Sequence, residues 1–268
     1  MASATGAASW PMYDLPELDR SHDRLWSLVR AELAGRGTST PDRLSHRPRL
    51  PEAWTRPDLV VSQTCGWPLV TELGRRVTTI GTFRYRIAGA EGGTYRSRIV
   101  SRIVGRRAPS DLGLGDLVGR TAAVNARNSL SGWVSLVAGL GLSGGWPGPV
   151  LVTGGHAESL RALADGRADV ASIDAVTYAL VERLRPELVD HLVDLGSGPR
   201  VPCLPIIGPA GLSGVQLATW RRALSAAITG TGAAPVRDAL LIEAFTPMDL
   251  ADYEAALEPL RAMVDTAG

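Results

Sequence analysis

The stretch Asn125-Ala126-Arg127-Asn128-Ser129-Leu130-Ser131-Gly132-Trp133 indicates the fold more strongly than any other segment. It lies between a short apolar run, 121–124, and a helix-like run. A polar loop that opens a helix is a natural anion site, because the first amides of a helix lack intrahelical acceptors and the helix dipole favours negative charge. Ser129 and Ser131 would add hydroxyl donors, and Gly132 would let the backbone approach closely. The alternative is an ordinary N-cap serine on a core helix.

Composition predicts a globular protein that does not bind nucleic acid. Of the 268 residues, 45% are hydrophobic and 21% are charged, and the formal net charge is +1. This composition is ordinary for a globular protein, and a net charge near zero provides no excess of basic residues that would bind the phosphate backbone of a nucleic acid. The four histidines and two cysteines are scattered without the spacing of metal ligands. We therefore expect no metal and no cofactor.

The sequence contains no recognisable export or membrane segment. The first nine residues lack the basic region and the apolar region of a signal peptide. The apolar runs elsewhere fall far below the ~20 residues that a membrane helix needs. We therefore expect no membrane insertion. The expected location is the cytoplasm, or the periplasm if a signal peptide is missing from this sequence.

Helical and extended patterns alternate along the chain, which predicts an α/β fold with largely parallel strand pairing. Segments that begin with a capping residue and repeat apolar positions every three or four residues are predicted to be helices. Short apolar or alternating segments are predicted to be strands. The predicted helices are 19–35, 156–165, 175–184, 214–229 and 249–264, and the predicted strands are 8–14, 58–64, 77–85, 94–104, 121–124, 149–154, 168–174 and 201–207.

Polar side chains gather at the predicted carboxyl ends of strands, where open α/β sheets bind ligands. Tyr13 would close one wall of a cleft, with interface packing as the alternative. Gln63 and Thr64 would supply neutral hydrogen bonds, with capping of a strand end as the alternative. Asp174 would meet an amine or hydroxyl of the ligand, with an N-cap of the following helix as the alternative.

The order of four motifs resembles the phosphonate/phosphate-type solute-binding proteins of ABC transporters. The motifs are a Tyr-x-Ser strand at 94–100, an Asp-Leu-x-Gly-Arg turn at 116–120, the serine loop at 128–133, and a helix beginning at His156 that leads into Ala-Asp-Val-Ala-Ser-Ile-Asp at 168–174. The similarity extends over roughly residues 8 to 207, and the specificity lies in the order and spacing of the motifs.

The resemblance implies a two-lobed fold of the type 2 periplasmic-binding class, with a ligand cleft between two Rossmann-like lobes. Residues 1–87 and 196–268 are expected to form one lobe, and residues 88–195 the other. The ligand would be a small anionic solute, the partner an ABC transporter permease, and no catalysis would be involved. The predicted ligand-binding residues are Tyr13, Gln63, Thr64, Tyr95, Ser129, Leu130, Ser131, Gly132, His156 and Asp174.

Two positions of the serine loop depart from the family. Leu130 stands where the family has a hydroxyl, and Trp133 stands where it has tyrosine. Leucine cannot donate a hydrogen bond, so a phosphoryl oxygen facing it would be desolvated without a partner. If Trp133, Trp67 and Tyr13 face the same cleft, their rings would add apolar surface, and together with Leu130 they would favour an organic anion over inorganic phosphate. By analogy with the family, His156 would donate to an anionic oxygen, with a satisfied core histidine as the alternative.

Two other functions fit the same sequence. An enzyme on this fold, of the thiamine-pyrimidine-precursor or menaquinone-pathway type, would need a reactive group in the cleft. Cys65, at a strand end, is the one candidate nucleophile, although a small packed residue is the alternative. A cytoplasmic ligand sensor would agree with the lack of an export signal. The motifs favour binding without chemistry.

Overall fold

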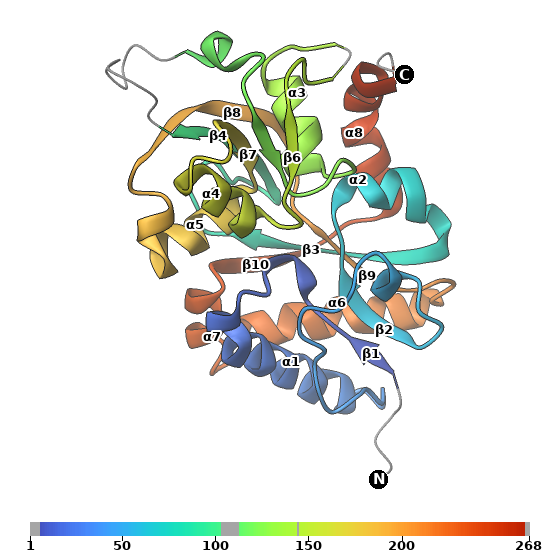
Figure 1. The fold of residues 1–268 in the computed structure, drawn as a ribbon. Coiled ribbons are helices and arrows are strands. Elements are labelled where there is room, and N and C mark those ends of the chain that lie inside the picture. Colours follow the sequence, from blue (N-terminus) through green and yellow to red (C-terminus); the bar gives the residue numbers. More distant parts are fainter. Residues whose placement is uncertain (1–5, 103–112, 144, 266–268) are drawn as a thin grey trace. The chain divides into compact units, whose positions relative to one another are not determined.

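The computed structural model describes residues 6–102, 113–143 and 145–265. The chain divides into two compact units, each built around a mixed sheet (Figure 1). Unit 1 contains residues 6–86, 90–93 and 202–255. Unit 2 contains residues 87–89, the described part of 94–201, and 256–265. Each unit is therefore assembled from segments that are distant in the sequence.

Unit 1 has a five-stranded sheet in the order β1-β2-β9-β3-β10. Its strands are β1 (Ala7–Ala8), β2 (Leu59–Gln63), β3 (Val77–Tyr85), β9 (Pro205–Pro209) and β10 (Ile242–Pro247), and its helices are α1 (Asp19–Ala34), α2 (Gly66–Pro68), α6 (Gly214–Thr229) and α7 (Ala234–Ala239). Its core includes Trp54, Leu69, Val77, Ile207 and Tyr253.

Unit 2 has a five-stranded sheet in the order β6-β5-β7-β4-β8. Its strands are β4 (Thr94–Arg102), β5 (Ala122–Val124), β6 (Val150–Val152), β7 (Val170–Ile173) and β8 (Leu192–Pro202), and its helices are α3 (Ser135–Gly139), α4 (His156–Ala164) and α5 (Ala175–Leu184). The last helix, α8 (Leu250–Asp265), begins among the residues of unit 1 and ends among those of unit 2. The core of unit 2 includes Ile99, Val124, Leu136, Trp146 and Val170.

The helices form where apolar residues recur at helical spacing or where a capping residue marks the first turn. Leu25, Val29 and Leu33 lie one helical turn apart on α1, and all three are buried. At the start of α6, Ser213 and Gln216 form a capping box, in which each side chain accepts from the backbone N–H of the other residue. None of the described helices is both long and apolar enough to cross a membrane.

Three sequence predictions about the strands are wrong. The pairing is mixed: β1–β2, β5–β6 and β5–β7 are parallel, whereas β2–β9, β3–β9, β3–β10 and β4–β7 are antiparallel. The predicted strand 8–14 ends at Ala8 and gives way to a 3₁₀ turn, because Pro11 begins that turn. The predicted strand 201–207 is divided between β8 and β9, with a break at residues 203–204. β4 covers residues 94–102 of the predicted strand 94–104, and the last two positions of that prediction lie outside the described residues.

Candidate functional site

The serine loop of unit 2 connects β5 to a widened helical turn. Leu130–Val134 form a π-helical turn that continues directly into α3. The N–H groups of Trp133 and Val134 both donate to the carbonyl of Ser129, at 3.1 and 3.0 Å. Ser129 Oγ accepts from the N–H of Gly132 at 3.1 Å, so Ser129 is the N-cap of this segment. The cap uses one lone pair, and the hydroxyl proton stays available for donation.

Gly132 packs closely against the side chain of Asn125 at the start of this segment. A Cβ at this position would overlap the Oδ1 of Asn125 and would lie 3.3 Å from Ser129 Oγ. Asn125 follows β5, and its Oδ1 is buried and has no hydrogen-bond partner among the described residues. Asn125 opens the polar loop that the sequence predicts as an anion site, immediately after a predicted strand, although it is not among the predicted ligand-binding residues.

The structure brings Ser131 and His156 together. Ser131 Oγ lies 2.8 Å from the Nε2 of His156, which is the first residue of α4. Ser172, on β7, donates to the carbonyl of Ser131 at 2.6 Å and so ties the loop to the sheet. Two helical segments therefore begin side by side, with a hydroxyl and an imidazole at their starts.

The imidazole of His156 is electrically neutral. Burial alone lowers its pKa to about 3. A neutral imidazole carries one N–H and one acceptor nitrogen, and the Nδ1 of His156 is buried without a partner among the described residues. The pair can thus present neutral donors to an oxyanion without a charged side chain.

Asp174 and Leu130 are buried in unit 2. Asp174 Oδ1 accepts from the N–H groups of Val176 and Thr177 at 2.9 and 3.0 Å, and it therefore caps α5. Asp174 is thus the N-cap that the sequence offered as an alternative, and its contact with a ligand stays a prediction. Leu130 is 1% exposed. The predicted contact residue Tyr95, on β4, is also buried.

A cation lies next to the serine loop. The guanidinium carbon of Arg127 is 4.7 Å from the centroid of the Trp133 ring. Arg127 is exposed, whereas Trp133 is half-buried and packs against the core of unit 2. Trp133 therefore serves core packing, and Arg127 supplies a solvated positive charge on its ring.

In unit 1, Tyr85 connects two of the predicted residues. The rings of Tyr13 and Tyr85 meet edge to face with centroids 5.3 Å apart. The amide of Gln63 donates to the Tyr85 hydroxyl at 3.3 Å. Thr64 is buried, and its N–H donates to the carbonyl of Pro205 at 3.0 Å. Sequence reasoning missed Tyr85, although it ends a predicted strand as Gln63 does.

The cysteines do not form a disulfide. Cys65 is half-buried and stands at the N-cap position of α2, and Cys203 is buried. A nucleophilic cysteine needs a neighbouring base or cation that lowers its pKa. The carbonyl of Cys65 accepts from the N–H of Leu69 at 3.2 Å, and a catalytic role for its thiol stays a prediction.

Comparison with known proteins shows the family. The family model described as ABC transporter, phosphonate, periplasmic substrate-binding protein matches residues 70–253. No curated protein sequence matches the chain. The match confirms the resemblance that the four motifs indicated.

Solved structures share the fold across nearly the whole chain. A Xanthomonas citri protein bound to chloride ion has a TM-score of 0.69 at 15% identity, covering 97% of this chain and 100% of its own. PhnD1 from Prochlorococcus marinus, in complex with methylphosphonate, has a TM-score of 0.67 at 12% identity, covering 97% and 98%. A binding-protein component of an ABC phosphonate transporter from Pseudomonas aeruginosa has a TM-score of 0.69 at 15% identity, covering 97% and 86%.

These likenesses show the fold, and the family model shows the membership. The predicted α/β fold of the two-lobed periplasmic-binding class is confirmed. This chain belongs to the phosphonate family of periplasmic substrate-binding proteins of ABC transporters.

Proposed function

We propose that this chain captures a small organic anion of the phosphonate class for an ABC transporter. The observation that carries the proposal is the contact between Ser131 Oγ and His156 Nε2 at the starts of two helical segments. Helix N-termini hold anions through free amides and the helix dipole, and two such ends add their effects. The family's role in phosphonate transport supports the same ligand class.

The ligand's chemical class follows from the donors around the pair. The hydroxyls of Ser129 and Ser131 and the neutral ring of His156 can donate to anionic oxygens, whereas Leu130 cannot. An inorganic phosphate has four oxygens to satisfy, whereas a phosphonate or carboxylate has fewer and carries an apolar portion. The missing hydroxyl therefore favours an organic anion over phosphate.

Binding explains the Ser131–His156 pair better than catalysis does. Their spacing of 2.8 Å is also that of a nucleophile and its base. A base whose pKa is about 3 is weak near neutral pH, where catalysis would take place. A catalytic base is also oriented by a third group, and the Nδ1 of His156 has no hydrogen-bond partner among the described residues. We therefore propose a binding protein without enzymatic activity.

Calorimetry on protein stripped of ligand by refolding tests this function. The panel is phosphate, phosphite, methylphosphonate, aminoethylphosphonate and an alkyl sulfonate. We expect saturable heat with at least one organic anion and weaker binding of inorganic phosphate. No heat with any anion would mean that the serine loop only caps a helix. Tight binding of phosphate alone would contradict the proposed role of Leu130.

We further propose an ABC transporter permease as the partner and the periplasm as the location, as the family suggests. Fractionation of cells that produce the native gene product tests the location. The protein is expected in the periplasmic fraction. A purely cytoplasmic pool would favour the ligand sensor instead.

A further inference from the structure

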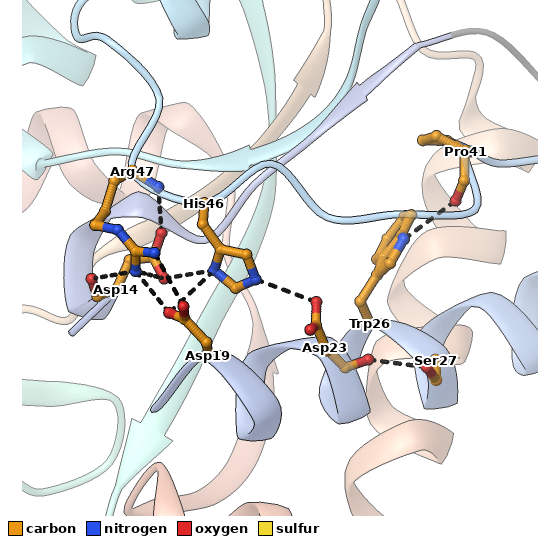
Figure 2. Close-up of polar contacts among 8 residues, drawn as sticks. All are labelled: Asp14, Asp19, Asp23, Trp26, Ser27, Pro41, His46 and Arg47. Atoms are coloured by element: carbon orange, nitrogen blue, oxygen red, sulfur yellow. Dashed lines mark hydrogen bonds and ion pairs between the residues drawn. The ribbon is translucent and has the colours of Figure 1, made fainter. Parts of the chain in front are cut away.

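A cluster of charged side chains lies beside Tyr13 in unit 1. Asp14 follows the 3₁₀ turn 11–13, and Asp19 and Asp23 belong to the first turns of α1. His46 and Arg47 come from the connector between α1 and the 3₁₀ turn 52–54. Figure 2 shows Asp14 and Asp19 next to both the imidazole and the guanidinium, and Asp23 on the other side of the imidazole. Segments that are up to 33 residues apart in the sequence thus meet through their charges.

The two ring nitrogens of His46 both face carboxylates. Nδ1 lies 2.8 Å from Asp14 Oδ1, and Nε2 lies 3.1 Å from Asp23 Oδ1 (Figure 2). Asp19 Oδ1 is 3.5 Å from Nδ1. An ionised carboxylate only accepts hydrogen bonds, so each ring nitrogen must donate to its partner. Imidazole has two N–H donors only when it is protonated. The geometry therefore requires the imidazolium form.

The cluster is close to charge balance only in that form. The side chain of Asp14 is 2% exposed, and the backbone N–H of Arg47 donates to its Oδ2. The guanidinium of Arg47 binds both oxygens of Asp19, at 2.6 and 2.9 Å. With His46 protonated, two cations face three carboxylates. With His46 neutral, a single guanidinium remains and the buried Asp14 loses a charged partner.

His22 faces the same cluster from α1 and does not supply the missing charge. It is buried, and its Nε2 lies 3.0 Å from the carbonyl of Tyr13. Burial lowers the pKa of His22, so the ring is neutral near pH 7 and its Nε2–H donates to that carbonyl. The backbone of Tyr13 is thus held in two ways: its carbonyl accepts from His22, and the residue that follows it, Asp14, is fixed by the cluster.

The proton on His46 leaves at a higher pH than it does from an ordinary imidazole. Burial lowers the pKa of His46, but the hydrogen bonds to Asp14 and Asp23 and the charges of Asp14 and Asp19 outweigh burial and raise the pKa above its ordinary value. A raised pKa means that the folded state holds the proton more tightly than the unfolded state does. The stability that His46 contributes is therefore full below its ordinary pKa and is lost as the pH rises through the raised value.

We propose that His46 is a proton-dependent positioning residue for Tyr13. As imidazolium it clamps Asp14 to the start of α1 and thereby fixes the backbone of the adjoining Tyr13. When the proton leaves, one of the two carboxylate contacts is lost and Tyr13 is less firmly held. If Tyr13 contacts the ligand, as the sequence predicts, ligand affinity then falls as the pH rises. This consequence rests on the proposed function, whereas the movement of Tyr13 does not.

NMR titration of the full chain tests the clamp without any ligand. The His46 ring resonance is expected to titrate above 6.5, its ordinary value. The Tyr13 ring resonance should shift with the same midpoint. Asp23→Asn removes one partner and should lower the His46 midpoint, whereas Asp42→Asn, an exposed residue of the same connector, should not. A His46 midpoint at or below 6.5, or a Tyr13 shift that persists in His46→Gln, overturns the proposal.

Calorimetry with methylphosphonate tests the consequence for binding. Wild-type affinity should fall through the His46 midpoint, and His46→Gln should give a flat profile over that range. His191→Gln, a matched substitution in unit 2, should keep the wild-type profile. An unchanged pH profile in His46→Gln contradicts the link to binding. If methylphosphonate does not bind at all, the proposed function fails, and the NMR result alone decides the clamp.

Discussion

Ser131 Oγ lies 2.8 Å from His156 Nε2, although 25 residues separate the two in the sequence. Ser172 fixes the Ser131 carbonyl from β7, so the hydroxyl is held by the sheet as well as by its own turn. A donor whose position is set before the ligand arrives loses little entropy on binding.

Ser131→Ala is expected to weaken phosphonate binding by about 1–3 kcal/mol, because a ligand oxygen would lose its hydroxyl partner. Calorimetry against methylphosphonate measures the change. Ser225→Ala, an exposed serine on α6, is the matched control and should bind like wild type. Equal affinity in Ser131→Ala would show that the hydroxyl serves only His156.

The stability of the protein should depend on His156 at low pH. The unfolded chain takes up a proton near the ordinary pKa of 6.5, whereas the folded ring stays neutral until about 3. The free energy of unfolding is thus lowered as the pH falls through this range. In urea denaturation, the amount by which the free energy of unfolding of wild type exceeds that of His156→Gln should decrease as the pH falls from about 7 to about 4. A constant difference would mean that the ring protonates easily in the folded state.

Gly132→Ala should weaken both folding and binding, because the new methyl group would overlap Asn125 Oδ1. Overpacking of this kind costs about 1–3 kcal/mol. The double variant Asn125→Ala/Gly132→Ala removes the overlapping oxygen and should recover part of the loss, measured by thermal unfolding. Gly214→Ala is the control, since nothing lies within 4 Å of a Cβ there. A single variant as stable as wild type would contradict the steric argument.

Asp174→Asn separates helix capping from ligand recognition. Asparagine caps a helix as well as aspartate does, so stability should change little. Asp174→Ala removes the cap and should cost about 1 kcal/mol of stability. If the carboxylate meets a ligand amine, Asp174→Asn loses affinity for aminoethylphosphonate and keeps affinity for methylphosphonate. Unchanged binding of both ligands would leave Asp174 with a capping role only.

Sequence patterns predicted the helices better than the strands. α5 and α6 have the predicted bounds, and α1 ends one residue early, because apolar periodicity and capping residues mark such helices clearly. β10, α7 and most of β8 were missed. β8 contains Gly196 and Gly198 and is half exposed along much of its length, so it lacks the apolar pattern of a buried strand.

The site could be predicted only where residues share a local motif. The serine loop and His156 belong to motifs with fixed spacing, and the structure brings Ser131 and His156 into contact. The ends of predicted strands mark Asn125 and Tyr85, but the contacts that bring these residues and Ser172 to the site form through tertiary packing, which no local pattern records. The His46 cluster depends on a connector that no periodicity describes.

The most direct measurement is a high-resolution crystal structure of protein stripped of ligand and then soaked with methylphosphonate. We predict tetrahedral density whose oxygens lie roughly 2.6–3.2 Å from Ser131 Oγ and from a His156 ring nitrogen. Density elsewhere in the protein, or none at saturating methylphosphonate, would contradict the account.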